Sequence, residues 1–181
     1  MASKADPGPR IPWRIIGWAI PVALLTIPWL AQWPWSASDF VVAAVIFGIV
    51  GGTFELAVRA SGNASYRLGA AAAIGTASLL VWVNLAVGII GNENNPLNLM
   101  FFGVILTALV GGIAARFRAD GMARTMIVTA ALQAAIGIGV FLTDAGGSEP
   151  PGAIGLLLLI EFFALGWAVS AALFQKAAAQ Q

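Results

Sequence analysis

The chain has 181 residues, of which 60% are hydrophobic and 9% are charged, with a net charge of +1. Soluble domains carry about 25% charged residues, so a chain this poor in charge cannot cover a globular surface and belongs in a lipid bilayer. Cysteine and histidine are both absent, which excludes disulfides, thiolate sites and imidazole ligands for zinc or haem. No basic run is present to hold a nucleic-acid backbone.

Six apolar segments are long enough to cross the hydrocarbon core, which takes about 20 residues. We therefore predict an all-α membrane protein with six transmembrane helices. A disordered cytoplasmic tail is expected at 1–10, the six-helix bundle at 11–176 and a frayed cytoplasmic end at 177–181. The first segment also resembles a signal peptide, but prolines interrupt its apolar run and we interpret it as the first helix. The segments cover residues 13–33, 40–59, 67–91, 97–116, 124–143 and 152–174.

The basic residues predict the orientation of the chain. All nine lie in the N-terminal tail, after the second segment, after the fourth segment or at the C-terminus. The other three connections contain acidic residues and no lysine or arginine. Because basic residues stay on the cytoplasmic side, both termini are expected there. The basic residues are Lys4, Arg10, Arg14, Arg59, Arg67, Arg116, Arg118, Arg124 and Lys176; the acidic ones are Asp39, Glu93, Asp144 and Glu149.

The order of the segments suggests a repeat. An arginine opens each odd-numbered segment, and the even-numbered segments align without gaps, so a two-helix hairpin of parallel orientation would occur three times. Small residues lie toward the cytoplasmic halves of the even segments, where they let helix backbones approach closely. They serve either packing inside the bundle or contact with a partner helix or a second copy through Gly48, Gly52, Gly111 and Gly112.

Glu161 is the main candidate for function. It lies ten residues after Pro151 and fifteen before Lys176, close to the bilayer midplane, where a charged carboxylate costs about 2.5–3.5 kcal/mol on insertion scales. We expect it to be protonated or hydrogen-bonded within the bundle. Gln133 and then Thr76 are its expected partners, because both lie at a similar depth. Three alternatives are a neutral clasp that fixes helix register, the passage of protons or a solute, and contact with a partner subunit.

The connection around residues 91–98 is rich in asparagine. Gly91 is expected to end the third helix, Asn95 to cap the fourth and Pro96 to occupy its first position. Asn84 lies in the outer third of the third helix, where a buried amide needs a partner and could brace this turn. If this connection has a function, we expect its remaining polar residues to line a vestibule or to bind a cation weakly. They are Asn92, Glu93, Asn94 and Asn98.

Other polar and aromatic residues have ordinary explanations. Glu55 and Arg59 are spaced to form an ion pair on one helix face, and most tryptophans mark the membrane interfaces. Trp82 and Trp167 lie deeper, which leaves open a pocket for a quinone or pigment. No metal site and no cofactor are predicted, and a bound lipid or apolar pigment remains an alternative.

The segment Val83–Met100, VNLAVGIIGNENNPLNLM, followed by GGIAARFRADGMAR, resembles a group of small polytopic bacterial inner-membrane proteins. The resemblance covers the third to fifth helices and implies a helical fold in that membrane. It carries no catalytic residue across. Because the spans also hold no nucleophile beside a base, we expect no enzyme. We expect an accessory, assembly or scaffold subunit that packs against a larger membrane complex or itself, or alternatively a small channel or carrier that uses Glu161.

Overall fold

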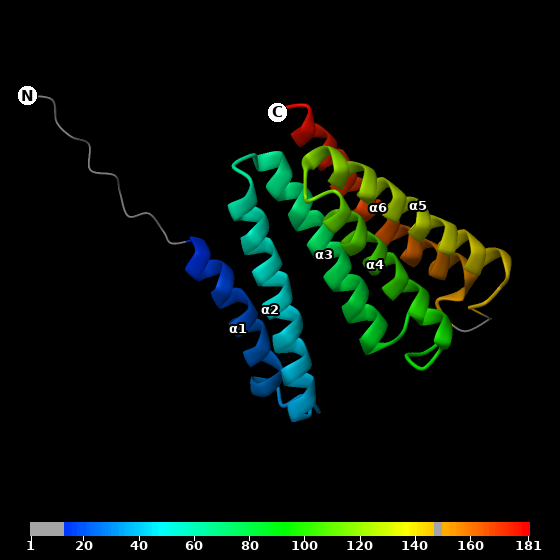
Figure 1. Cartoon of the computed structure of the whole chain (residues 1–181). Helices are drawn as coiled ribbons and strands as arrows, with labels where there is room; N and C mark the ends of the chain where they lie inside the picture. The colour runs from blue at the N-terminus through cyan, green and yellow to red at the C-terminus, as the bar shows by residue number, and fades with distance from the viewer. Residues whose placement is uncertain (1–12, 147–149) are drawn as a thin grey trace, which may run out of the picture. The chain divides into compact units, whose positions relative to one another are not determined.

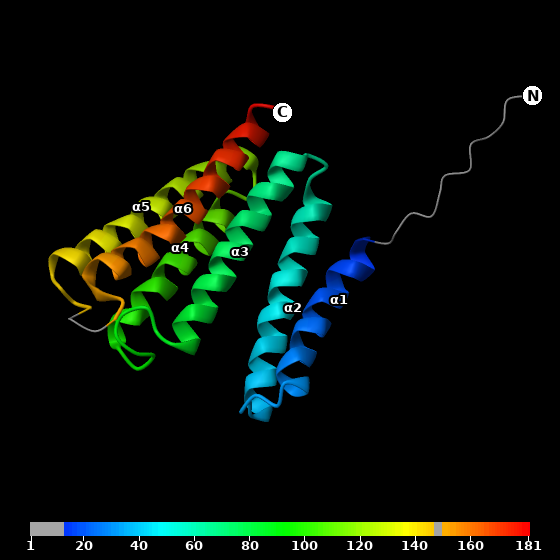
Figure 2. The same ribbon diagram turned by 180° about the vertical axis from the view of Figure 1, so that it is seen from behind.

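The computed structural model describes residues 13–146 and 150–181, and in this part of the chain the helices are joined by loops and there are no strands. The expected tail at 1–10 and Glu149 lie outside the described residues. Six α-helices and one 3₁₀ turn follow one another, as Figures 1 and 2 show from opposite sides. Their bounds are α1 Trp13–Leu30, α2 Ala37–Ala60, α3 Ala64–Ala86, η1 Pro96–Asn98, α4 Leu99–Ala114, α5 Ala119–Leu142 and α6 Gly152–Ala178.

Five of these helices are long and apolar enough to cross a bilayer: α2, α3, α4 with its leading turn, α5 and α6. The prediction of an all-helical, multi-pass membrane protein is therefore confirmed at this level. The shorter helix α1 spans 18 residues, and its role as a sixth span stays a prediction.

The chain divides into two compact units. The first extends to Gly52 and holds α1 with most of α2. Ser36 caps α2 in a reciprocal arrangement: its backbone N–H donates to Oδ2 of Asp39 over 2.7 Å, while its hydroxyl oxygen accepts the backbone N–H of Asp39 over 3.4 Å. This is the capping box expected where a hydroxyl residue precedes an acid by three positions. The two helices approach closely at Gly51, where an added Cβ would lie 2.8 Å from Cη2 of Trp18.

The second unit, residues 53–181, is built on four helices. α5 and α6 share the largest contact, α3 packs on α6, and α4 packs on α5, whereas α3 and α4 touch little. Both views show these four helices side by side (Figures 1 and 2). The suggested threefold repeat of hairpins stays a prediction, since the strongest contacts of α3 and α4 are with α6 and α5 rather than with each other.

Large apolar side chains fill the interior of the second unit. Leu80, Phe101, Ile160, Phe163, Trp167 and Phe174 are all fully buried. Glycines let the helices meet around them. An added Cβ at Gly69 would lie 3.2 Å from the ring of Phe174, and one at Gly112 would lie 3.3 Å from the ring of Phe117. Close backbone approach supplies dispersion contacts where lipid leaves no hydrophobic drive between helices.

Hydrogen bonds and a ring contact connect the segments at the end of the unit where α3 begins. Asn63 caps α3 by accepting the N–H of Tyr66 over 3.1 Å. The Tyr66 hydroxyl donates to the carbonyl of Phe117 over 2.7 Å, and its ring meets that of Phe174 edge-on. Just before this end, Arg59 pairs with Glu55 over 2.9 Å, which confirms the expected i,i+4 ion pair.

At the opposite end of the second unit, the prediction that Gly91 ends the third helix is wrong. α3 ends at Ala86, and Gly88, not Gly91, takes the left-handed conformation that follows its C-cap, with φ of +73°. Hydropathy extended the helix because residues 87–90 are mostly apolar. Ile89 and Ile90 are indeed buried, at 4% and 0% exposure, but they lie in a loop.

Candidate functional site

Glu161 lies on α6 against α5. Its side chain is half-buried, and its Oε1 atom is enclosed without a hydrogen-bond partner. The carboxyl group faces Gly137, where an added Cβ would lie only 2.5 Å from Oε1 and 3.0 Å from Cγ2 of Ile160. The missing side chain at Gly137 therefore makes the space that admits the carboxyl group between the two helices. We call this place the α5–α6 seam: Glu161 and Ile160 on α6, with Gly137 and Gln133 on α5.

Gln133 lies one helical turn before Gly137 and is 0% exposed. Neither its Oε1 nor its Nε2 atom has a hydrogen-bond partner. The expected hydrogen bond between Glu161 and Gln133 is therefore not formed, although both residues belong to facing helices. An unpaired amide in an apolar interior costs about 1–3 kcal/mol on protein mutational scales, so this pair of side chains is the main polar imbalance of the second unit.

Thr76, the other expected partner of Glu161, does not contact its carboxyl group. It faces Gly166 on α6, whose added Cβ would lie 3.0 Å from Cγ2 of Thr76. Five residues separate Gly166 from Glu161, a rotation of about 140° around a helix of 3.6 residues per turn. Thr76 and Glu161 thus approach different sides of α6.

Asn84 and Asn98 organise the loop between α3 and α4 by hydrogen bonds to its backbone. Asn84 donates through Nδ2 to the Asn98 carbonyl over 3.2 Å, as expected for a brace. The Asn98 Oδ1 accepts the backbone N–H groups of Ile89 and Ile90 over 3.1 and 2.9 Å, and its Nδ2 donates to the Asn92 carbonyl over 2.8 Å. Asn98 is 4% exposed, so its side chain does not face a vestibule.

The rest of this loop is exposed. Asn95 caps the turn Pro96–Asn98 by accepting the N–H of Leu97, with Pro96 at the first position, which confirms that prediction. Asn92 accepts the N–H of Asn94 over 2.9 Å, and Asn94 donates to Glu93 over 3.3 Å. In the described ranges, no group of three or more acidic, histidine or cysteine residues comes together.

Trp167 was predicted only as a deep aromatic residue. It is 1% exposed, and its Nε1–H has no hydrogen-bond partner. Trp82, in contrast, is 36% exposed on α3. One residue is thus in the core and the other on the surface of the unit. Gly137 was not singled out by the sequence, because in the run AIGIGV it is indistinguishable from Gly139.

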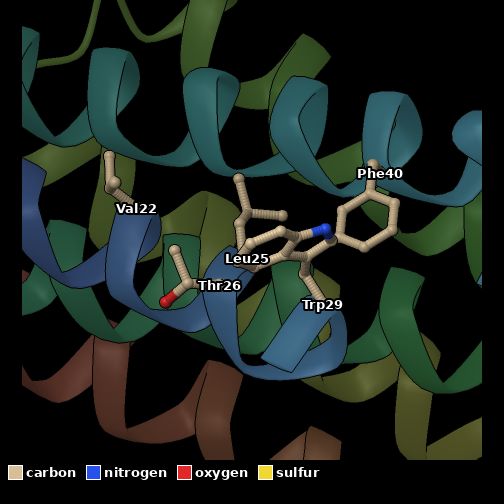
Figure 3. Close-up of a pocket in the computed structure, with 5 residues that line it drawn as sticks. All are labelled: Val22, Leu25, Thr26, Trp29 and Phe40. Carbon is tan, nitrogen blue, oxygen red and sulfur yellow. The ribbon is translucent and has the colours of Figure 1, made fainter. Parts of the chain in front are cut away.

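Among the described residues lie two apolar grooves and one partly polar cavity. In the first unit, a groove of about 440 Å³ is lined by Val22, Leu25, Thr26 and Trp29 of α1 and Phe40 of α2 (Figure 3). Its one hydroxyl, on Thr26, already donates to the carbonyl of Ala23. In the second unit, a groove of about 250 Å³ lies between α3 and α6 beside Thr76 and Gly166, and a cavity of about 210 Å³ lies against the loop between α3 and α4, beside Gly88 and Pro151. None of the three is lined by Glu161 or Gln133.

Comparison of the chain with models of protein families, with curated proteins and with solved structures found no match.

Proposed function

We propose that this membrane protein is a non-catalytic accessory, assembly or scaffold subunit of the bacterial inner membrane, with both termini in the cytoplasm. Its working surface would be the sides of its helices, packed against a larger membrane complex or a second copy. The absence of histidine and cysteine from the sequence leaves few groups for catalysis. The proposed location in a bacterial inner membrane is supported by the sequence resemblance. The proposed orientation of the chain is supported by the positions of its basic residues.

The observation that carries this proposal is the glycine face of α2. Within the described part of the first unit, nothing lies within 4 Å of an added Cβ at Gly48 or Gly52, whereas Gly51, between them, packs on Trp18. Val41 and Val45 continue the same helix face, one and two turns earlier, and are 62% and 54% exposed. A face of two glycines four residues apart, flanked by β-branched residues, suits close packing of a second transmembrane helix.

Gly111 and Gly112 of α4 do not offer such a face. An added Cβ at Gly111 would lie 2.9 Å from Oγ1 of Thr125 on α5, and Gly112 meets Phe117. These two residues serve packing within the second unit. The proposed partner surface is therefore narrowed from four glycines to Gly48 and Gly52.

Purification in a gentle detergent, followed by mass spectrometry and measurement of the particle mass, tests the proposal. We expect stoichiometric partner chains or a defined homo-oligomer. The double substitution Gly48→Leu with Gly52→Leu should dissociate the assembly because it fills the face. Val42→Leu is the matched control, since Val42 lies on the same helix, is 47% exposed and is rotated by about 80–120° from the two glycines around the helix axis. A clean monomer from the unaltered chain would contradict the accessory role.

The α5–α6 seam favours a second candidate function, a small channel or carrier for protons or a small solute. Ionisable residues inside a membrane span are expensive and usually functional, and Glu161 leaves an unpaired oxygen there. Against this stand Asn84 and Asn98, which are used by the loop, and Thr76, which faces another side of α6. A flux assay in liposomes tests this function: Glu161→Gln should lower flux, and unchanged flux of every solute tried would argue against it.

A further inference from the structure

The end of the second unit at which α3 begins holds every basic residue of that unit. The Tyr66 hydroxyl joins the start of α3 to the connection between α4 and α5, and Nδ2 of Asn63 donates to Oε1 of Gln180 after α6 over 3.0 Å. Figures 1 and 2 show these three segments together. Six basic residues against Glu55 and Asp120 give this end a net charge of +4. The basic residues are Arg59, Arg67, Arg116, Arg118, Arg124 and Lys176.

Part of this positive charge is already used within the protein. Arg59 pairs with Glu55, and the guanidinium group of Arg67 donates to two backbone carbonyls at and after the end of α2, over 2.8 and 3.2 Å. The other four basic residues are exposed. Arg118 lies 3.7 Å from Asp120, with 77% of its side chain exposed. The remaining three have no acidic partner among the described residues: Arg116, Arg124 and Lys176.

Lys176 lies at the level of the first turn of α5, although it belongs to α6. The two helices are antiparallel neighbours (Figure 1), and Gly137 of α5 faces Ile160 of α6. Sixteen residues from this contact, about 24 Å along each axis, α5 has reached its first turn and α6 has reached Lys176. The four exposed basic residues therefore lie at one end of the α5–α6 pair. We call them the basic cluster: Arg116, Arg118, Arg124 and Lys176.

The backbone holds one member of the cluster in an unfavourable conformation. α4 ends in a Schellman motif, in which the Phe117 N–H donates to the Gly112 carbonyl over 3.0 Å and the Arg116 N–H donates to the Ile113 carbonyl over 2.9 Å. Arg116 thus occupies the position where glycine is usual, with φ of +50°, and Phe117 follows with φ of +55°. Residues with a Cβ are disfavoured there, so the ending of α4 does not explain an arginine at this position.

An exposed apolar surface adjoins the basic cluster. Phe117, between two of its arginines, is 51% exposed, and Ile113, one turn earlier on α4, is 56% exposed. On α5, Val128 lies one turn after Arg124 on the same face and is 57% exposed. α5 has 24 residues and a length of about 36 Å, which exceeds a hydrocarbon core of about 30 Å, so its first turn reaches the headgroup layer. Positive charge therefore lies beside a surface for acyl chains.

We propose that the basic cluster binds the phosphate group of an anionic phospholipid, whose acyl chains lie along Phe117, Ile113 and Val128. Arginine donates paired N–H groups to phosphate oxygens. An anionic phospholipid matches both the charge and the apolar surface, whereas free phosphate matches only the charge and a zwitterionic lipid brings a second positive group to the cluster. The site requires neither the accessory role nor transport, and it is the same whichever leaflet this end faces.

Native mass spectrometry of the full chain in neutral detergent tests the site, with phosphatidylglycerol and phosphatidylcholine of identical acyl chains added in equal amounts. We expect the unaltered chain to retain more phosphatidylglycerol. The double substitution Arg116→Gln with Arg124→Gln should lower the ratio of the two bound lipids by about fivefold for each arginine, the usual contribution of one basic residue near an anionic lipid surface. Equal retention of both lipids by the unaltered chain would overturn the proposal in favour of an acidic segment of a partner protein.

The double substitution Asn92→Asp with Asn94→Asp is the matched control. It lowers the net charge by the same amount, at exposed positions of the opposite end of the unit, and should leave the lipid ratio unchanged. An equal loss in this control would overturn the proposal, because the effect would then depend on net charge and not on the basic cluster.

Arg116→Gly separates lipid binding from folding. Glycine suits a φ of +50°, so this variant should unfold at a higher temperature than the unaltered chain in neutral detergent, while its lipid ratio falls by about fivefold. An undiminished ratio would overturn the role of Arg116. Calorimetric titration of inorganic phosphate into the lipid-free chain should show no saturable binding, and saturable binding would overturn the assignment to a lipid.

Discussion

Asn84 on α3 donates through Nδ2 to the backbone carbonyl of Asn98 over 3.2 Å, fourteen residues later in the chain. Both side chains are buried, at 5% and 4% exposure. Asn98 in turn accepts the backbone N–H groups of Ile89 and Ile90, so one side chain satisfies two amides that have left the helix. The pair explains how two isoleucines can be buried in a loop at the end of a membrane bundle, where unpaired backbone groups are costly.

The contacts of Asn98 predict a large effect of its loss. Asn98→Ala would leave the amides of Ile89 and Ile90 buried without an acceptor, at a cost of about 1–3 kcal/mol for each unsatisfied group. Thermal unfolding in detergent should show a clearly lowered midpoint. Asn94→Ala provides the control, because Asn94 is exposed and bonds only within its own turn. Equal midpoints for the two variants would contradict the bracing role.

The backbone at Gly88 predicts a glycine requirement. Gly88→Ala combines a left-handed φ of +73° with a Cβ that would lie 2.7 Å from the backbone nitrogen of Glu93. We expect destabilisation of at least about 1 kcal/mol from the conformation alone, with more from the clash. At Gly75, inside α3, nothing lies within 4 Å of an added Cβ. Gly75→Ala should therefore stabilise the protein by up to about 1 kcal/mol, so the two glycine variants should shift the unfolding midpoint in opposite directions.

The hydroxyl of Tyr66 predicts a smaller effect at the other end of the unit. Tyr66→Phe keeps the edge-on ring contact with Phe174 but removes the 2.7 Å hydrogen bond to the Phe117 carbonyl. A net loss of about 0.5–1.5 kcal/mol is expected for one hydrogen bond. Tyr66→Ala should cost several times more, because it also removes the buried ring. Thermal unfolding of the two variants separates these contributions, and an unchanged midpoint for Tyr66→Phe would show that the hydroxyl contributes nothing.

The basic residues predict which loops face the cytoplasm, and the lack of cysteine makes the test simple. In intact cells, a membrane-impermeant maleimide should label Asn94→Cys from outside, because residue 94 is exposed and the positive-inside rule predicts that its loop faces outward. Arg118→Cys, in the connection between α4 and α5, should be labelled only after lysis. The reverse pattern would invert the orientation and refute the positive-inside argument for this chain.

Helix positions were predictable from the sequence to within a few residues, because about 20 apolar residues in a row have few other stable conformations in a bilayer. The ends were less predictable. Hydropathy could not distinguish the last turns of α3 from the loop at 87–90, since buried loop residues and buried helix residues are equally apolar. The Asn98 side chain determines where the helix ends, because it accepts the backbone N–H groups of Ile89 and Ile90 in place of helical carbonyl groups.

The sequence by itself determined an all-helical membrane protein, the local cap at Asn95 with Pro96 after it, and the Glu55–Arg59 pair, because each follows from composition or short-range spacing. Only the tertiary structure decided that Glu161 meets Gly137, that Thr76 turns to Gly166, and that Gly111 and Gly112 pack internally while Gly48 and Gly52 are open. Those relationships depend on which helix lies beside which and at what rotation. The spacing of residues along one helix predicts neither its neighbour nor its rotation. Apolar helix faces pack against one another with little preference, and glycines and polar side chains select the register.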